Sequence, residues 1–271
     1  MKNGIFASQA CLIELLTPKQ DAPDFEGGLA AFRERFFKIR AHNSVVSIPD
    51  NPMGNLHFTA MEVLEHLQLE LEPESLLIHL NTFHRKADLD SFLSEADTRG
   101  IRYLLCVSGD GSPRLPKLAP EDFNFPVTTI TSVELLKYIH GKYPGRFSCG
   151  VAFNQYEPEE HETAKLRRKL EAGANFIITQ PVMDLSRKIL DLGGHDVPVF
   201  VGAWLSKRLD LLYPCVGVEP PNPLPEFLPD AHFRQLAEWY PDFKRYCTML
   251  GFKRDWAGLF PQIKSGANAV A

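Results

Sequence analysis

The sequence lacks the features that would assign it to three large classes of protein. No run approaches the roughly 18 apolar residues that a membrane-spanning helix needs. The five cysteines include no C-x-x-C pair, so no metal site and no nucleophilic thiol are expected. The formal net charge of -5 argues against a dedicated nucleic-acid binder, which normally carries a basic face.

The cysteines and the N-terminus indicate a cytoplasmic protein. Three cysteines lie in apolar, strand-like runs, which is typical of free buried thiols in a reducing compartment. Residues 1–16 contain a short apolar run but no clear cleavage signal, so we interpret them as a strand and not a signal peptide. The 271 residues, 44% hydrophobic and 23% charged, are expected to form one domain of barrel size over 1–271.

Short apolar runs alternate with amphipathic stretches along most of the chain. The apolar runs predict strands at 11–16, 44–48, 76–80, 103–107, 148–153, 176–179 and 197–201. The amphipathic stretches predict helices at 28–41, 58–69, 87–98, 132–143, 159–171 and 185–192. This alternation is typical of a parallel sheet covered by helices, and seven such units favour a closed (β/α)8 TIM-type barrel. An open dinucleotide-binding sheet would need a glycine-rich turn after its first strand, and TPKQDAPDFEGG has no G-x-G-x-x-G.

The eighth unit is predicted to be atypical or incomplete. The C-terminal segment at about 215–271 combines a proline-rich insertion, 218–229, with a helical stretch, 231–250. The best candidate for the eighth strand is Gly258–Phe260, and no helix is predicted after it. We therefore expect imperfect closure, or a seam that a second copy or a partner subunit covers.

Polar residues follow six successive predicted strands. In such a barrel the carboxyl ends of the strands build the catalytic face, so these side chains are expected to gather there. The residues are Glu14, Asp50, Asn51, His79, Asn81, Thr82, Ser108, Gly109, Asp110, Asn154, Gln155, Thr179 and Gln180. Their consistent placement predicts a cleft lined by hydrogen-bonding groups.

Taken singly, the same residues have simpler explanations. Glu14 lies among leucines and isoleucine, which indicates a partly buried carboxyl suited to proton donation, or else a structural ion pair. Asp110 in SGDG and Asp50 before Asn51-Pro52 are also typical turn residues. His79 is compatible with a core histidine. Arg168 and Lys169 lie on a helix rich in glutamates, as on a solvated face.

Five segments between residues 11 and 205 carry a family resemblance: IELLTPK, IHLNTFHR, GIRYLLCVSGD, GVAFN and LRRKLEAGANFIITQPVMD. The last is the most specific. Together they resemble the methylenetetrahydrofolate reductase family, which consists of flavin-dependent barrel enzymes. The resemblance implies reduction of 5,10-methylenetetrahydrofolate to 5-methyltetrahydrofolate. It also implies that NADH or NADPH reduces a bound FAD, and that the reduced FAD delivers hydride to the methylene carbon.

The resemblance also implies roles for individual residues. Glu14 matches the acid that protonates the departing nitrogen, and Asp110 matches an aspartate near flavin and pterin. Gln180 matches a glutamine that binds the pterin, and Asp50 and Thr179 are expected beside it. The residues expected to contact FAD are His79, Asn81, Ser108, Gly109, Asn154, Arg168 and Lys169. The last two match basic residues that reach the phosphates and the ribityl chain.

The departures from the family pattern concentrate on the flavin site. Ser108 stands where many members have arginine, Asn154 stands where some have tyrosine, and Lys165 replaces an asparagine. The eighth-strand motif is not recognisable. These differences leave two alternatives open. One is a flavin-independent reductase that passes hydride directly from NAD(P)H to the folate. The other is a folate-binding methyl-transfer or accessory subunit with a partner over the seam.

Overall fold

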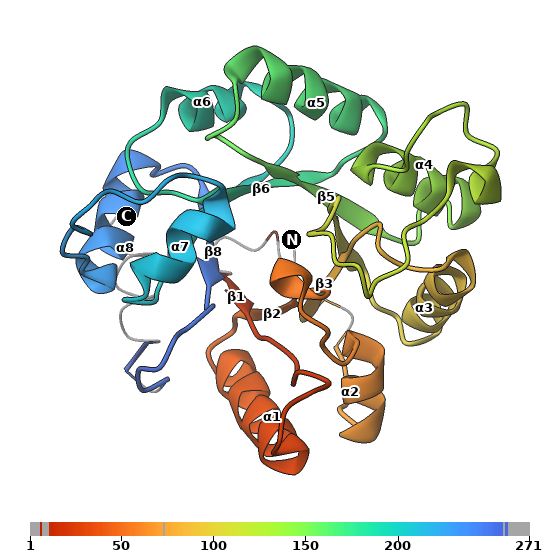
Figure 1. Ribbon diagram of the computed structural model, residues 1–271, viewed down its shortest axis with the longest axis horizontal. Coiled ribbons are helices and arrows are strands. Elements are labelled where there is room, and N and C mark those ends of the chain that lie inside the picture. The colour runs from red at the N-terminus through yellow and green to blue at the C-terminus, as the bar shows by residue number, and fades with distance from the viewer. Residues whose placement is uncertain (1–5, 7–10, 73, 257, 260–271) are drawn as a thin grey trace.

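A computed structural model of the chain describes residues 6, 11–72, 74–256 and 258–259. Eight parallel strands form a closed barrel in chain order, and the helices surround it (Figure 1). The strands are β1 Leu12–Glu14, β2 Val45–Ile48, β3 Leu76–Leu80, β4 Tyr103–Cys106, β5 Ser148–Phe153, β6 Phe176–Pro181, β7 Val199–Trp204 and β8 Lys244–Thr248. The predicted TIM-type barrel is thus confirmed.

Each strand but the last is followed by helical structure before the next strand begins. The α-helices are α1 Phe25–Ala41, α2 Ala60–His66, α3 Lys86–Thr98, α4 Ser132–Lys142, α5 Glu159–Glu171, α6 Arg187–Leu190, α7 Leu209–Val216 and α8 Pro229–Trp239. Short 3-10 turns are η2 Pro52–Gly54, η3 Pro120–Phe123 and η4 Asp191–Gly194. The proline-rich insertion is the connection between α7 and α8.

The strands are buried on both sides, and alternate residues serve two different cores. One set, which includes Ile13, Val46 and Ile177, packs against the helices. The other set fills the barrel interior: Leu12, Val45, Leu77, Tyr103, Leu105, Phe176, Ile178, Phe200 and Tyr246. Gly150 makes room there, because a Cβ at this position would lie 2.0 Å from the ring of Phe176. This alternation decides which polar residues at the strand ends point into the barrel mouth.

The prediction for the eighth strand was wrong. β8 lies at Lys244–Thr248, inside the stretch expected to be helical, whereas Gly258 lies in a turn and Leu259 is helical. Phe260 lies outside the described residues. β8 pairs with both β7 and β1, with Leu12 opposite Tyr246, so the barrel closes completely and leaves no seam between strands.

Two residues show why the helix ends before β8 and how a charge is accommodated in this strand. Pro241 follows Tyr240, the C-cap residue of α8, and a residue before proline is disfavoured in helical conformation, so the helix ends there. Arg245 looks out of place in a buried strand, yet its guanidinium donates to the carbonyls of Leu236 at 3.0 Å and Tyr240 at 3.2 Å. The guanidinium of Arg245 in β8 therefore caps the carboxyl end of α8.

Candidate active site

Two adjoining cavities open at the carboxyl ends of the strands. The mouth cavity, about 170 Å³, lies over the barrel interior and is lined by Glu14, Pro49, Asp50, Pro52, Met53, His79, Leu105, Val107, Gly109, Asp110, Ala152, Ile178, Thr179, Gln180, Pro181, Cys215, Tyr246, Thr248 and Leu250. The side cavity, about 430 Å³, is lined by Cys106, Val107, Ser108, Gly109, Asp110, Thr131, Ser132, Val133, Ala152, Asn154, Glu157, Glu162, Lys165, Arg168, Lys169 and Gln180. Their shared wall comprises Val107, Gly109, Asp110, Ala152 and Gln180.

Glu14 is a buried carboxyl in the wall of the mouth cavity. It ends β1 and points inward because it is two residues beyond Leu12, which faces the barrel interior. Burial raises its pKa from 4.5 to about 7, although the hydroxyl of Tyr246 and the backbone amide of Met249 donate to it and oppose that rise. A carboxyl with this pKa is about half protonated at neutral pH, and its protonated form can give a proton to a bound ligand.

A neutral histidine lies beside this carboxyl. His79 is two residues beyond Leu77 on β3, and its Nε2 lies 2.9 Å from Oγ of Ser47 and 3.3 Å from Oη of Tyr246. Burial lowers the pKa of His79 to about 4, and the charge of Asp50 only partly offsets this. His79 lines the mouth cavity and does not line the side cavity, where most of the residues expected to contact FAD lie.

An irregularity in β6 separates the roles of Thr179 and Gln180. The register between β6 and β7 shifts after Ile178, and Gly202 allows the strands to approach, since a Cβ there would lie 2.7 Å from the carbonyl oxygen of Gln180. The Thr179 hydroxyl fills the gap: it accepts from the Gly202 amide and donates to the Gln180 carbonyl, both at 2.9 Å. Gln180 lines both cavities, and its side-chain amide bonds to no other described residue.

Asp110 connects two loops at the edge of the mouth. Its Oδ2 accepts from the backbone amide of Met53 at 2.9 Å. Gly109, with φ of 80°, brings the loop against Asn81, whose side chain would be 2.7 Å from an added Cβ. The exposed carboxylate of Asp110 thus faces both cavities while it holds the η2 turn in place.

Asp50 and Asn81 are engaged mainly with other protein groups. Oδ2 of Asp50 accepts from Nε2 of His84 at 2.6 Å and from the Asn81 amide at 3.0 Å. Burial would lower the pKa of His84, but the hydrogen bond and charge of Asp50 outweigh it and raise that pKa. The buried Asn81 side chain donates to the Asp50 carbonyl and accepts from the Phe83 amide. Both residues therefore hold the loops around the mouth.

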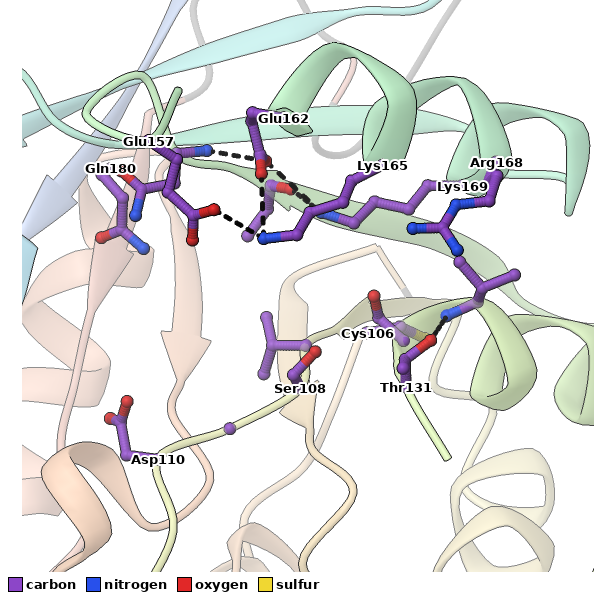
Figure 2. A pocket seen from close by; sticks show the side chains of 16 residues that line it. Cys106, Ser108, Asp110, Thr131, Glu157, Glu162, Lys165, Arg168, Lys169 and Gln180 are labelled. Atoms are coloured by element: carbon purple, nitrogen blue, oxygen red, sulfur yellow. Dashed lines mark hydrogen bonds and ion pairs between the residues drawn. The ribbon is translucent and has the colours of Figure 1, made fainter. Parts of the chain in front are cut away.

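Ion pairs cross the upper wall of the side cavity (Figure 2). Glu162 is buried on α5 and lies 3.5 Å from Nζ of Lys165 and 3.6 Å from Nζ of Lys169. Lys165 also pairs with Glu157 at 2.7 Å, and Lys169 donates to the carbonyl of Ala152 at 2.7 Å. Burial lowers the pKa of Lys169. These two lysines are therefore largely neutralised by the protein itself.

An exposed cation lies at the far end of the side cavity. Arg168 is exposed there, and among the described residues it has no acidic partner within ion-pair distance. Arg168 lines this end of the cavity together with Thr131, the N-cap residue of α4, and both are labelled in Figure 2. The N-terminus of α4 is already capped, because the Val133 amide donates to the Thr131 hydroxyl and the Thr131 amide donates to the Glu134 carboxylate. Arg168 is therefore the group that suits this end of the cavity to an anionic ligand. Ser108 and Asn154 line the same cavity.

Sequence reasoning missed Tyr246 and Glu162. Tyr246 was hidden because its strand was predicted as helix. The glutamates of α5 are typical of a solvated face, yet Glu162, Leu166 and Lys169 recur at helical spacing on the buried side of the helix. That spacing was the available signal.

The cysteines are free as predicted, four of them buried and Cys215 partly exposed in the wall of the mouth cavity.

The fold and the site define a parallel (β/α)8 barrel with a buried acid at its mouth and a second cavity beside it. The family model of methylenetetrahydrofolate reductase matches residues 12–190, and the chain belongs to that family.

No described helix has the length and apolar character needed to cross a bilayer. No three potential metal ligands among His, Cys, Asp and Glu gather within the described part of the chain.

Sequence relatives agree with this assignment at modest identity. Methylenetetrahydrofolate reductase 2 of Saccharomyces cerevisiae is 29% identical over 126 residues, which is 42% of this chain and 20% of that protein. The probable methylenetetrahydrofolate reductase (NADPH) of Caenorhabditis elegans is 24% identical over 169 residues, 58% of this chain and 24% of that protein. The matches thus span a quarter or less of the length of these relatives.

One solved structure with the same fold is an uncharacterized protein from Clostridium thermocellum that binds two copies of 5-methyl-5,6,7,8-tetrahydrofolic acid. The TM-score is 0.62 at 12% identity, over 97% of this chain and 95% of that chain. A dihydropteroate synthase from Coxiella burnetii in complex with pteroic acid has a TM-score of 0.52 at 12% identity, over 100% and 96% of the two chains. At this identity the likeness concerns the fold alone.

Proposed function

We propose that the chain reduces 5,10-methylenetetrahydrofolate to 5-methyltetrahydrofolate in the mouth cavity. The observation that carries this proposal is the carboxyl of Glu14, which is buried in the wall of a cavity that Gln180 and Asp110 also line and whose pKa is raised to about 7. Membership of the methylenetetrahydrofolate reductase family supports it. So does the folate bound by the protein from Clostridium thermocellum, a barrel with the same fold.

The proposed roles follow from the chemistry of each side chain. Opening the methylene bridge requires a proton on the departing nitrogen, and Glu14 supplies it. The free amide of Gln180 both donates and accepts, so it can pair with the pyrimidine edge of a pterin. Asp110, at the boundary of the two cavities, adds a fixed negative charge beside the reacting ring. Thr179 and Asp50 keep supporting roles, because their polar atoms are engaged within the protein.

The side cavity is the proposed place of the hydride donor. Its volume lies within the range of ordinary ligand pockets. Its far end, with the guanidinium of Arg168, suits the pyrophosphate of FAD, while its near end opens on the shared wall. When bound, FAD supplies hydride to the methylene carbon after NADH or NADPH has reduced it. We assign the phosphate contact to Arg168 alone, because Lys169 is held by Glu162 and the Ala152 carbonyl.

The ion pairs in the side cavity favour a second candidate, direct hydride transfer from NAD(P)H to the folate. Lys165 and Lys169 are already neutralised by Glu157 and Glu162, which leaves Arg168 as the one cation of the cavity wall without an acidic partner among the described residues. The argument for an accessory subunit is weaker than the sequence suggested, because the seam that a partner would cover is closed by β8.

Two measurements on the purified chain test the proposal. The first is folate-dependent oxidation of NADH or NADPH. We expect turnover that Glu14→Gln abolishes while its folding is retained. Folate binding without turnover, with or without added FAD, would refute the reductase assignment. The second is the visible absorption spectrum: the spectrum of an oxidised flavin supports FAD, and a colourless protein with full turnover supports direct transfer.

A further inference from the structure

A column of polar groups runs from β2 across the barrel interior to Glu14. The hydroxyl of Ser47 lies 2.9 Å from Nε2 of His79, and Nε2 lies 3.3 Å from the hydroxyl of Tyr246. The Tyr246 hydroxyl then donates to Oε2 of Glu14 at 3.0 Å. The four residues come from β2, β3, β8 and β1, so the column joins strands that lie on both sides of β1.

This column does not lead to solvent through the barrel. Ser47 is 0% exposed, and the interior below the column is apolar, with Leu12, Val45 and Leu77 fully or almost fully buried. A proton taken from Glu14 has no acceptor further along, because His79 is a weak base held neutral by burial. The column therefore fixes the orientation and the charge of the Glu14 carboxyl and does not deliver protons to it. Protons must reach Glu14 from the mouth cavity.

We propose that Tyr246 is the positioning residue of the acid: its hydroxyl orients the carboxyl of Glu14 toward the mouth cavity and sets the pH at which that carboxyl loses its proton. This inference rests on the proposed function for its catalytic meaning. The phenol donates to Oε2, so it stabilises the ionised carboxylate and directs the proton of the neutral acid to the other oxygen. The column through His79 and Ser47 keeps the phenol in this orientation.

The other titratable groups around the carboxyl do not duplicate this effect. Cys215 faces it from α7, and Cys247 lies near it on β8; burial raises the pKa of both thiols, so they are neutral at physiological pH. His79 on β3 is neutral, and Asp50 acts on His79. The remaining donor to the carboxylate is the backbone amide of Met249. Among the described residues, Tyr246 is thus the side chain that donates a hydrogen bond to this acid.

The test is a direct titration of Glu14 in the ligand-free protein. Infrared difference spectra of the wild type, with Glu14→Gln to identify the carboxyl band, give the pH midpoint of ionisation. Tyr246→Phe is expected to raise that midpoint by about one to two pH units, because a hydrogen bond to the charged form is lost. Tyr103→Phe is the matched control, since Tyr103 belongs to the same interior cluster and makes no contact with Glu14 that would move its midpoint.

A second variant and a second readout keep the test decisive. Ser47→Ala leaves the Tyr246 phenol in place but loosens it, and should raise the midpoint less than Tyr246→Phe does. Unmoved midpoints in both folded variants would overturn the inference. In turnover, the high-pH limit of folate reduction should rise together with the midpoint. If the midpoint moves in Tyr246→Phe but the wild-type protein reduces no folate, the proposed function is refuted and the role of Tyr246 remains.

Discussion

Glu14→Gln should make the protein more stable at high pH while it removes activity. Glutamine has the shape of a protonated glutamate, and its oxygen can still accept the hydrogen bond that Tyr246 donates. It cannot ionise, however. The substitution therefore removes the free-energy cost of keeping a carboxylate buried and leaves the packing of β1 unchanged.

The sign and size follow from the pKa of Glu14, which is raised from 4.5 to about 7. The folded protein keeps this proton after the unfolded chain has lost it, so stability falls as the pH rises between those two values. Each unit of pKa corresponds to about 1.36 kcal/mol, so above pH 7 the buried carboxylate costs the folded state about 3 kcal/mol. Below the unfolded pKa the cost vanishes.

The assay is urea unfolding of wild type and Glu14→Gln at about pH 4 and about pH 8, on either side of this window. All other titrating groups are common to the two proteins, so the difference between their unfolding free energies isolates Glu14. That difference should grow by about 3 kcal/mol in favour of the variant from the lower to the higher pH. A difference independent of pH would show that Glu14 ionises normally, and the argument for a general acid would fail.

Three further predictions concern the cavity walls. Gln180→Ala should weaken folate binding by roughly tenfold or more in calorimetry without lowering the melting temperature, because its amide bonds to no other described residue; unfolding instead would indicate a structural role. Arg168→Gln should loosen the dinucleotide by about tenfold, most strongly at low salt, whereas exposed Arg167→Gln should not; equal effects would exclude a specific phosphate contact. Asp110→Asn removes the negative charge, but its side-chain oxygen can still accept from the Met53 amide. We expect turnover to fall by about tenfold, which would show that the charge matters; full turnover would show that only the loop contact does.

The elements that could be predicted from the sequence are those whose pattern is local. β3, β5 and α5 have the predicted bounds, Leu76–Leu80, Ser148–Phe153 and Glu159–Glu171. β3 lies between Ser75 and Asn81, β5 ends before Asn154, and α5 begins after Pro158. These local signals define the elements without any distant contact. The gathering of polar strand ends at one mouth also follows from parallel order alone.

The features that were missed depend on contacts between segments far apart in the chain. Arg245 belongs in a strand only because the carboxyl end of α8 folds back to receive it. The division of labour between Thr179 and Gln180 depends on Gly202 of the neighbouring strand. Tyr246 reaches Glu14 across 232 positions of sequence. Periodicity places such residues on an element, but it does not reveal their partners.

The mouth of the barrel carries both a buried acid and a strained turn. Glu14 is a desolvated acid, and Asn51 and Met53 adopt left-handed backbone with φ of 48° and 56°. Left-handed backbone at a non-glycine residue costs of order 1–3 kcal/mol and persists only where the surroundings enforce it. Here Asp110 enforces it through the Met53 amide, and the closed ladder of eight strands fixes the loops that carry both residues. Left-handed backbone also occurs at Asn43, Gln68 and Asn124, so the strained turn alone does not single out this rim. The buried acid does, because selection for stability alone would remove an ionisable group that costs the folded state free energy above pH 7.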